Sequence, residues 1–293
     1  MRCSVRILAF DTTGKNASVS YRNELGEITS LHSDEGYNHL TSLMPMIQKS
    51  VGDGGIDIIA VSAGPGSFTG IRIGISTARA LMQGLKVPGM GVKTLESFLY
   101  GMHPSKEYEK TEHTEKKIRI LCPIFDARRE EIYGATYVIG SIAGICADIL
   151  PEARVLPGIP ALCAIDECAE PLAVFLTKLR NLIEILLTQK EKLKKDVEIS
   201  IEFYGDGVDR YRDRIDEFFA FDLNGERKIS ICYADEEHRY QRAEWVMRCA
   251  EAYMNSKETL NQTLIFDPEK LLPNYLRRAE AERNLAKKRE NGD

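Results

Sequence analysis

Apolar and polar positions in the first hundred residues follow two patterns, the short runs typical of strands and the spacing typical of amphipathic helices. Three β-branched runs separated by turn residues predict three strands, and the apolar spacing between Leu40 and Val51 predicts a helix. In chain order, the predicted elements are strands at 5–10, 17–22 and 26–32, a helix at 40–51, a strand at 55–64, a helix at 71–85, a strand at 87–92 and a helix from Thr94. The order over residues 1–101 is therefore β-β-β-α-β-α-β-α.

A comparable order returns after a polar insert at 102–117. The second set comprises strands at 117–127, 131–139 and 145–157, a helix at 171–195, a strand at 198–205, a helix at 209–220, a strand at 228–234 and a helix at 242–255. The residues themselves show no repeat, so the duplication rests on element order. The pattern predicts two α/β lobes, at 1–101 and 118–256, and a tail at 257–293.

The loop "SAGPGSFTG" joins a buried strand to the start of the helix at 71–85. Free N–H groups at a helix start favour an anion, and Ser67 or Thr69 can cap this one. The P-loop signature fails because no Gly-Lys-Ser/Thr follows, and the dinucleotide fingerprint needs its third glycine one residue before Gly70. We therefore interpret the loop as a relic of nucleotide-binding architecture that positions the helix. Its residues are Gly64, Pro65, Gly66, Ser67, Phe68, Thr69 and Arg72.

Small residues recur along the helix that follows this loop. Gly70, Gly74 and Ala78 are spaced four apart and share one face, where each glycine costs roughly 1 kcal/mol relative to alanine. Such a stripe allows close approach either of the chain's own sheet or of a partner helix, and the sequence leaves both open. The predicted helix at 40–51 adds an exposed apolar stripe, which favours burial against another surface. The predicted partner interface comprises Leu40, Leu43, Met44, Ile47, Gly70, Gly74, Ala78 and Leu81.

Composition and charge indicate which classes of protein the chain can belong to. The 293 residues are 43% hydrophobic and 28% charged, as in a soluble globular protein. The apolar runs are too short to cross a bilayer and the N-terminus leads directly into a strand, so we expect a cytoplasmic protein without membrane contact. Seven cysteines without a Cys-x-x-Cys pair argue against a disulfide framework or a zinc site. A net charge of −5 provides no overall basic field, so binding of nucleic acid would need a partner.

Several motifs occur together in a family-specific order. The segment "AFDTTGKNASVSY" places Asp11, Thr12 and Thr13 in a turn between two strands, like the phosphate-binding hairpin of sugar kinases, actin and Hsp70. It is followed by "NHLTSLMPMI", "AVSAGPGSFTGIRIGISTARAL", "PGMGVKTLESF" and "FDARREEIYGATY", and later by "YGDGVDRYRDRI" and "LLPNYLRRAEAER". The chain thus resembles the bacterial TsaB family, also called YeaZ, over most of residues 5–138. The resemblance implies a duplicated ribonuclease H-like α/β fold.

The resemblance also implies a function in tRNA modification. A protein of this family is a non-catalytic subunit that supports a TsaD-type catalytic subunit, which forms N6-threonylcarbamoyladenosine at position 37 of tRNAs reading codons that begin with A. A TsaE-type ATPase joins them, tRNA binds only through the complex, and the isolated protein can form a homodimer. Nucleotide and metal are expected in the partner subunits, with no cofactor in this chain. The related M22 glycoproteases and kinase-like proteins leave an alternative, a metal- or ATP-dependent enzyme.

The residues at the relatives' metal site argue against that alternative. The catalytic relatives carry Asn-His-Leu-Glu-Gly-His, whereas the matching residues 93–98 place Thr94 and Phe98 at the two histidine positions. Threonine is a poor metal ligand and phenylalanine has no donor atom. We therefore expect neither a catalytic nor a metal-binding residue. Of the histidines, only His39 lies beside a family motif, and we read it as a helix-start or surface residue, with a functional role as the alternative.

Two groups remain candidates for contact with a ligand. Asp11, with Thr12 and Thr13, could hold a nucleotide-bound magnesium, but "TTGKN" lacks the fuller glycine-rich hairpin, so a degenerate, structural use is favoured. Asp126 and Arg128 follow a predicted strand and form either an ion-paired turn or part of a cleft between the lobes.

Overall fold

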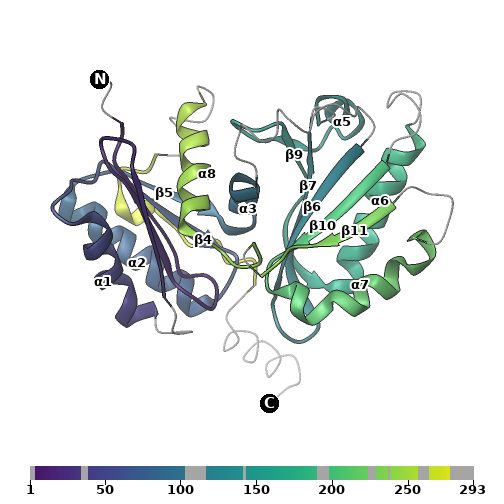
Figure 1. Ribbon diagram of the computed structural model, residues 1–293, viewed down its shortest axis with the longest axis horizontal. Helices are drawn as coiled ribbons and strands as arrows, with labels where there is room; N and C mark the ends of the chain where they lie inside the picture. Colours follow the sequence, from purple (N-terminus) through teal and green to yellow (C-terminus); the bar gives the residue numbers. More distant parts are fainter. Residues whose placement is uncertain are drawn as a thin grey trace, which may run out of the picture.

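Two sheets with flanking helices form the two halves of the molecule (Figure 1). The computed structural model describes residues 4–33, 39–102, 117–140, 143–189, 198–223, 229–236, 238–256 and 264–277. The first half contains β1 (Ile7–Asp11), β2 (Ser18–Arg22), β3 (Ile28–His32), α1 (His39–Val51), β4 (Ile58–Gly64), α2 (Phe68–Leu85), β5 (Gly89–Lys93) and α3 (Thr94–Met102). These elements match the predicted order, and the predicted insert at 102–117 falls almost wholly outside the described residues.

The second half carries the remaining strands and most of the remaining helices. Its elements are β6 (Lys117–Asp126), β7 (Glu131–Ile139), α5 (Ala143–Ile149), β8 (Arg154–Val155), β9 (Ala161–Pro171), α6 (Leu172–Thr188), β10 (Glu198–Tyr204), α7 (Gly207–Leu223) and β11 (Ile229–Tyr233). Helix α8 (Ala243–Asn255) and the 3-10 turn η1 (Pro268–Lys270) follow.

The two sheets share one topology. The first has the order β3-β2-β1-β4-β5, in which β1, β2 and β3 are antiparallel and β4 and β5 run parallel to β1. In the second, β9, β7 and β6 are antiparallel, and β10 and β11 run parallel to β6. Each half is therefore a ribonuclease H-like unit, and the duplicated fold predicted from the sequence is confirmed.

The third strand of the second half was predicted at the wrong place. Residues 145–157 form the end of α5 and the two-residue strand β8, while the long third strand is β9. Cys146 is buried, and Ile149 and Leu150 pack against the same core at helical spacing. Strand β9 contains "IDECAE" and is only half-buried along most of its length, so it lacks the apolar run that identifies a strand. The helix predicted at 171–195 ends at Thr188 in the described chain.

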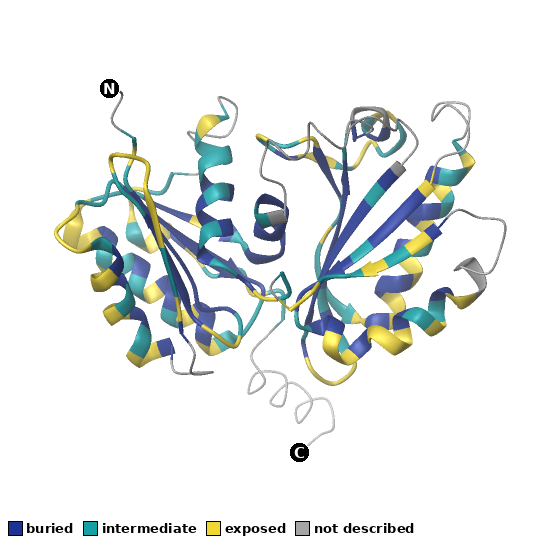
Figure 2. Ribbon diagram, viewed as in Figure 1, coloured by how far each residue is buried: buried dark blue, intermediate teal, exposed yellow. Residues whose placement is uncertain are grey.

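The first sheet is covered on both faces, which explains its nearly continuous apolar strands. Leu8 and Phe10 pack in the core beneath α1 and α2, whereas Ile7 and Ala9 pack in the core shared with α3 and α8. Figure 2 shows this burial along the strands of both halves. The alternation follows from the two-residue period of a strand.

Helix α8 returns from the second half to the first sheet. The Ala243 amide donates a 2.8 Å hydrogen bond to the Ser18 hydroxyl, and the Trp245 and Phe98 ring centroids are 4.9 Å apart. The element order had placed this helix with the lobe at 118–256. Its apolar face instead completes a core to which both halves contribute, including Leu121 and Tyr137 from the second sheet.

Two compositional expectations can be compared with the structure. No helix in the described ranges is long and apolar enough to cross a bilayer. The six cysteines in those ranges are free thiols, and Cys122, Cys146, Cys163 and Cys249 are buried.

Candidate functional site

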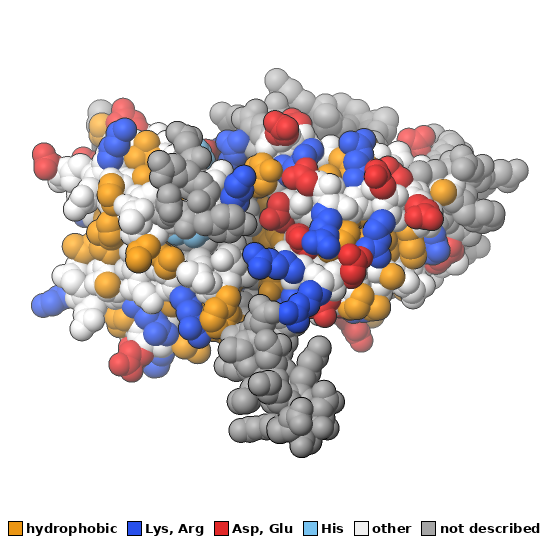
Figure 3. All heavy atoms as spheres, turned by 90° about the horizontal axis from the view of Figure 1, so that it is seen from below, with side chains coloured by type: hydrophobic (Ala, Val, Ile, Leu, Met, Phe, Trp, Pro, Cys, Tyr) orange, Lys and Arg blue, Asp and Glu red, His pale blue; other side chains and the backbone are white. Residues whose placement is uncertain are grey.

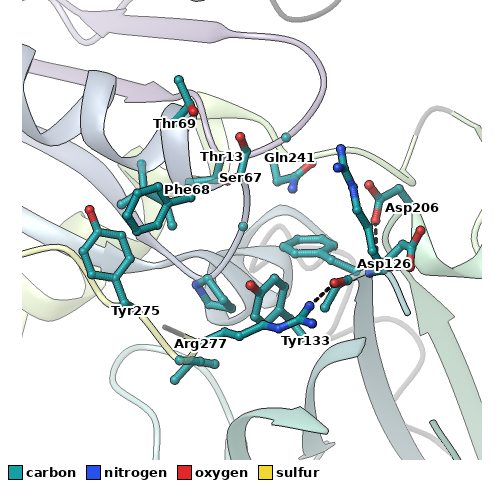
Figure 4. A pocket seen from close by; sticks show the side chains of 18 of the residues that line it. Thr13, Ser67, Phe68, Thr69, Asp126, Tyr133, Asp206, Gln241, Tyr275 and Arg277 are labelled. Carbon is teal, nitrogen blue, oxygen red and sulfur yellow. Dashed lines mark hydrogen bonds between the residues drawn. The ribbon is translucent and has the colours of Figure 1, made fainter. Parts of the chain in front are cut away.

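A cleft of about 660 Å³ lies between the two halves. The first half contributes the β1–β2 turn and the loop before α2, and the second half contributes the β6–β7 turn and the turn before α7. Residues 274–277 of the C-terminal segment form another wall (Figure 4). The volume of the cleft is in the range of sites that bind small molecules.

The β1–β2 turn is held together by a buried carboxylate. Both the amide and the hydroxyl of Thr13 donate to Asp11 Oδ1, at 2.7 and 2.9 Å, and the Ser62 hydroxyl donates to Oδ2. Burial raises the pKa of Asp11, and these hydrogen bonds oppose the rise. Asp11 and Thr12 are fully buried, which fits the structural use of the hairpin that the sequence favours over binding of a nucleotide. Thr13 lines the cleft but donates its hydroxyl to Asp11.

The loop before α2 packs directly on that turn. Ser67 caps α2 by accepting a 3.3 Å hydrogen bond from the Gly70 amide, and its own amide donates to the Thr13 carbonyl at 2.7 Å. The Thr12 hydroxyl donates to the Gly70 carbonyl at 2.7 Å. Polar groups at the start of α2 therefore form hydrogen bonds to the neighbouring hairpin.

The small-residue stripe of α2 faces the chain's own sheet. A methyl group on Gly70 would lie 1.8 Å from the Thr12 carbonyl oxygen, and one on Gly74 would lie 2.7 Å from the Thr12 hydroxyl. Ala78 is fully buried. The prediction that these three residues contact a partner is wrong, and the alternative, packing on the sheet, is correct.

The remaining predicted interface residues divide between core and surface. Leu43 and Ile47 lie on the buried, inner face of α1 and so cannot contact a partner. Leu40 is 76% exposed and Met44 is 39% exposed on the outer face of α1, while Leu81 on α2 is partly buried. We call Leu40, Met44, Leu81 and the exposed Leu85 the α1–α2 surface.

The β6–β7 turn brings Asp126 and Arg128 into the cleft. Arg128, Arg129 and Glu130 have φ values of 63°, 55° and 66°, a left-handed run that non-glycine residues rarely adopt. The Asp126 carboxylate accepts hydrogen bonds from the Arg128 amide at 2.8 Å, the Tyr211 hydroxyl at 3.0 Å and Arg210 at 3.0 Å. Asp126 therefore forms its ion pair with Arg210 and not with Arg128, and both residues of the turn line the cleft.

The C-terminal segment ties the halves together. The Asn274 amide donates to the Ala63 carbonyl at 2.7 Å, and its side chain donates to Glu167 at 2.9 Å. Arg277 pairs with Glu131 at 2.8 Å and also donates to the Ala127 carbonyl. Burial raises the pKa of Glu167 to about 8, against the opposing effect of Lys93.

Comparison with known proteins identifies the family. The family model described as "TsaD: tRNA N6-adenosine threonylcarbamoyltransferase" matches residues 30–285. The chain belongs to this family. Among curated proteins, TsaB of Escherichia coli is 36% identical over 138 residues, covering 45% of this chain and 55% of that protein. TsaB of Bacillus subtilis is 28% identical over 155 residues, covering 51% and 62%. The chain thus spans little more than half of these relatives, which place it with the TsaB proteins.

Solved structures agree on the fold. YeaZ from Pseudomonas aeruginosa is 20% identical, with a TM-score of 0.59 over 93% of this chain and all of that one. A second Pseudomonas aeruginosa structure, described as similar to peptidase YEAZ, gives 0.60 at 20% identity over 94% of this chain.

The start of α3 holds the residues that match the metal-binding motif of the catalytic relatives. Thr94 and Phe98, at the catalytic relatives' histidine positions, are fully buried, and Phe98 packs against Phe125 at 5.6 Å between ring centroids. Nearby Glu96 is buried and bound by Arg154 at 2.6 Å and by Tyr253. Within the described ranges, no group of three histidine, cysteine, aspartate or glutamate side chains could hold a metal. His39 is the first residue of α1; it is buried, and its Nε2 lies 3.0 Å from the Gly14 carbonyl oxygen.

Sequence analysis missed several cleft residues. They are Lys15, Tyr133, Asp206, Gln241, Tyr275 and Arg277. Asp206 and the last two lie inside the family-like motifs "YGDGVDRYRDRI" and "LLPNYLRRAEAER", which were the available signal. Lys15 and Tyr133 likewise lie inside "AFDTTGKNASVSY" and "FDARREEIYGATY", so that Gln241 alone of the six falls outside the quoted motifs.

Proposed function

We propose that the chain is a non-catalytic TsaB-type subunit that acts in the cytoplasm. It binds a TsaD-type catalytic subunit and supports formation of N6-threonylcarbamoyladenosine at position 37 of tRNAs reading codons that begin with A. Family membership and the names of the TsaB relatives, which are tRNA threonylcarbamoyladenosine biosynthesis proteins, support this role. A TsaE-type ATPase completes the complex, and nucleotide and metal belong to the partners.

The single observation that carries the non-catalytic part is the start of α3. Thr94 and Phe98 stand at the positions of two histidines in the catalytic relatives, and both are buried where the two halves share a core. Their burial leaves no room for a metal-bound water or a substrate. The Asp11 carboxylate is likewise buried and accepts hydrogen bonds from Thr13 and Ser62. It is therefore poorly placed to bind magnesium, as a kinase-like activity of this chain would require.

The α1–α2 surface is the proposed docking site for the catalytic subunit. Leu40 and Met44 are exposed on adjacent turns of α1, and methionine adapts to an irregular partner surface. The inward-facing glycines of α2 bring this helix close to the sheet. Arg79 of α2 binds the C-terminal segment, whereas Leu85 stays exposed and available to a partner. The isolated chain would use the same surface to form a homodimer.

Reconstitution tests this proposal. The chain, a TsaD-type protein and a TsaE-type ATPase from the same cell are mixed with ATP, an activated threonylcarbamoyl donor and an unmodified tRNA transcript, and the modified adenosine is measured. We expect product with all three proteins and a large loss when this chain is omitted. The isolated chain should neither hydrolyse ATP nor retain zinc or iron after dialysis. Turnover by the chain alone, or stoichiometric metal lost on His39→Ala, would favour the enzyme alternative.

A further inference from the structure

Cationic side chains from three separate parts of the chain surround the mouth of the cleft. Lys15 lies on the β1–β2 turn, Arg128 and Arg129 on the β6–β7 turn, and Arg277 on the C-terminal segment, and all four line the same cavity. Arg72, on α2, stacks over Phe68 at the rim, 4.0 Å from the ring centroid. Figure 3 shows lysine and arginine side chains across the middle of this face, where the halves meet.

The positive charge of this rim is neutralised only in part, since Arg277 pairs with Glu131 at 2.8 Å. In the described part of the chain, Lys15 and Arg128 have no carboxylate partner. The two carboxylates of the cavity are already engaged: Asp126 binds Arg210 and Tyr211, and Asp206 accepts the Asp126 amide at 3.1 Å. Although the chain has a net charge of −5, two cations without a carboxylate partner among the described residues, Lys15 and Arg128, line this one cavity.

Aromatic rings stand beside these cations. The Tyr275 and Phe68 ring centroids are 4.8 Å apart, and Arg72 Nε donates to the Tyr275 hydroxyl at 3.0 Å. Tyr275 is 38% exposed, so part of its surface faces solvent at the rim. Flat rings with a guanidinium beside them are stacking platforms for unpaired bases.

We infer that this rim binds a single-stranded stretch of the tRNA substrate, an inference that rests on the proposed function. Exposed lysine and arginine side chains suit phosphates, and exposed rings suit unstacked bases. Because the charges come from both halves, the ligand that meets them all is a chain with repeated negative charge lying across the mouth. An acidic peptide would satisfy the cations but not the rings.

The test measures affinity of a fluorescently labelled, unmodified tRNA transcript for the complex of this chain with its TsaD-type partner. Lys15→Gln and Arg128→Gln are combined, and Lys86→Gln is the matched control, because Lys86 is exposed and follows the last residue of α2, about 27 Å from its start. Partner capture is measured first for every variant. We expect normal capture, weaker tRNA binding for the double variant, and a salt dependence whose slope falls by about 1.4, or 0.7 for each lost phosphate contact.

The rings are tested separately. Tyr275→Ala should weaken tRNA binding about tenfold, whereas Tyr275→Phe, which keeps the ring, should stay within about twofold. Normal capture with unchanged tRNA affinity and salt slope in the double variant overturns this inference and leaves the proposed function intact. The same holds if that variant loses only binding of inorganic phosphate. Failure of the wild-type chain to capture its partner overturns both.

Discussion

The Thr12 hydroxyl donates a 2.7 Å hydrogen bond to the Gly70 carbonyl, and a methyl group on Gly70 would lie 1.8 Å from the Thr12 carbonyl oxygen. This contact joins the first hairpin of the molecule to the start of α2. It explains why the family-like loop ends in glycine, and it fixes the direction in which the outer face of α2 points.

Gly70→Ala should therefore be strongly destabilising. The added methyl group meets backbone, which cannot rotate away, so we expect a loss of about 3 kcal/mol or more in the free energy of unfolding. Gly84→Ala is the control, because nothing lies within 4 Å of its added carbon and alanine favours the helix. Urea unfolding of both variants checks this. Equal stability of the two would mean that α2 does not pack on the hairpin as described.

Substitutions on the two faces of the α1–α2 pair should separate folding from association. Leu40→Glu changes an exposed side chain, so stability should change by at most about 0.5 kcal/mol while capture of the TsaD-type partner is lost. Ala78→Tyr overpacks the core and should unfold the chain or cost about 3 kcal/mol. Thermal unfolding and pull-down are compared, with Val155→Glu as an exposed apolar control on the second half. A folded Leu40→Glu variant with normal capture would place the interface elsewhere.

Glu167 should make stability depend on pH. Its pKa is raised from the ordinary 4.5 to about 8 by burial, so the folded protein keeps a proton that the unfolded chain releases. The free energy of unfolding therefore falls as the pH rises from about 4.5 through 8, by at most about 1.4 kcal/mol per pH unit. Glu167→Gln should remove this fall, whereas Asp53→Asn, on an exposed turn, should keep it. Urea unfolding at pH 6 and pH 8 is the measurement, and parallel profiles for Glu167→Gln and wild type would contradict the prediction.

Arg154→Met should cost about 2 kcal/mol, because it leaves the buried Glu96 carboxylate with Tyr253 as its remaining donor among the contacts described. The partial exposure of Arg154 keeps the loss below that of a fully buried pair. Adding Glu96→Gln should recover at least half of it. Arg6→Met breaks a more exposed pair with Asp57 and should cost less than Arg154→Met. A double-mutant cycle with no coupling would show that the pair is not formed.

Local patterns determined most of the elements. The three runs before residue 33 and the helical spacing from 71 to 85 each depend on neighbours a few positions apart, and β1 to α3 follow the predicted order. The repeated order of strands and helices predicted the duplicated fold, and the motif string from Gly64 to Gly74 indicated the family. Strand β9 was missed because its half-buried, polar sequence carries no such local signal.

Tertiary structure decided which faces meet. The period of α2 places Gly70, Gly74 and Ala78 on one side but cannot say whether the sheet or a partner lies there, and only the contact with Thr12 settles it. Likewise, Lys15 and Tyr275 are 260 positions apart in the sequence, yet they line one cleft. Periodicity reports the environment of a side chain within its own helix or strand. The partner it meets is set by long-range packing of the two sheets, α8 and the C-terminal segment, which no short stretch of sequence encodes.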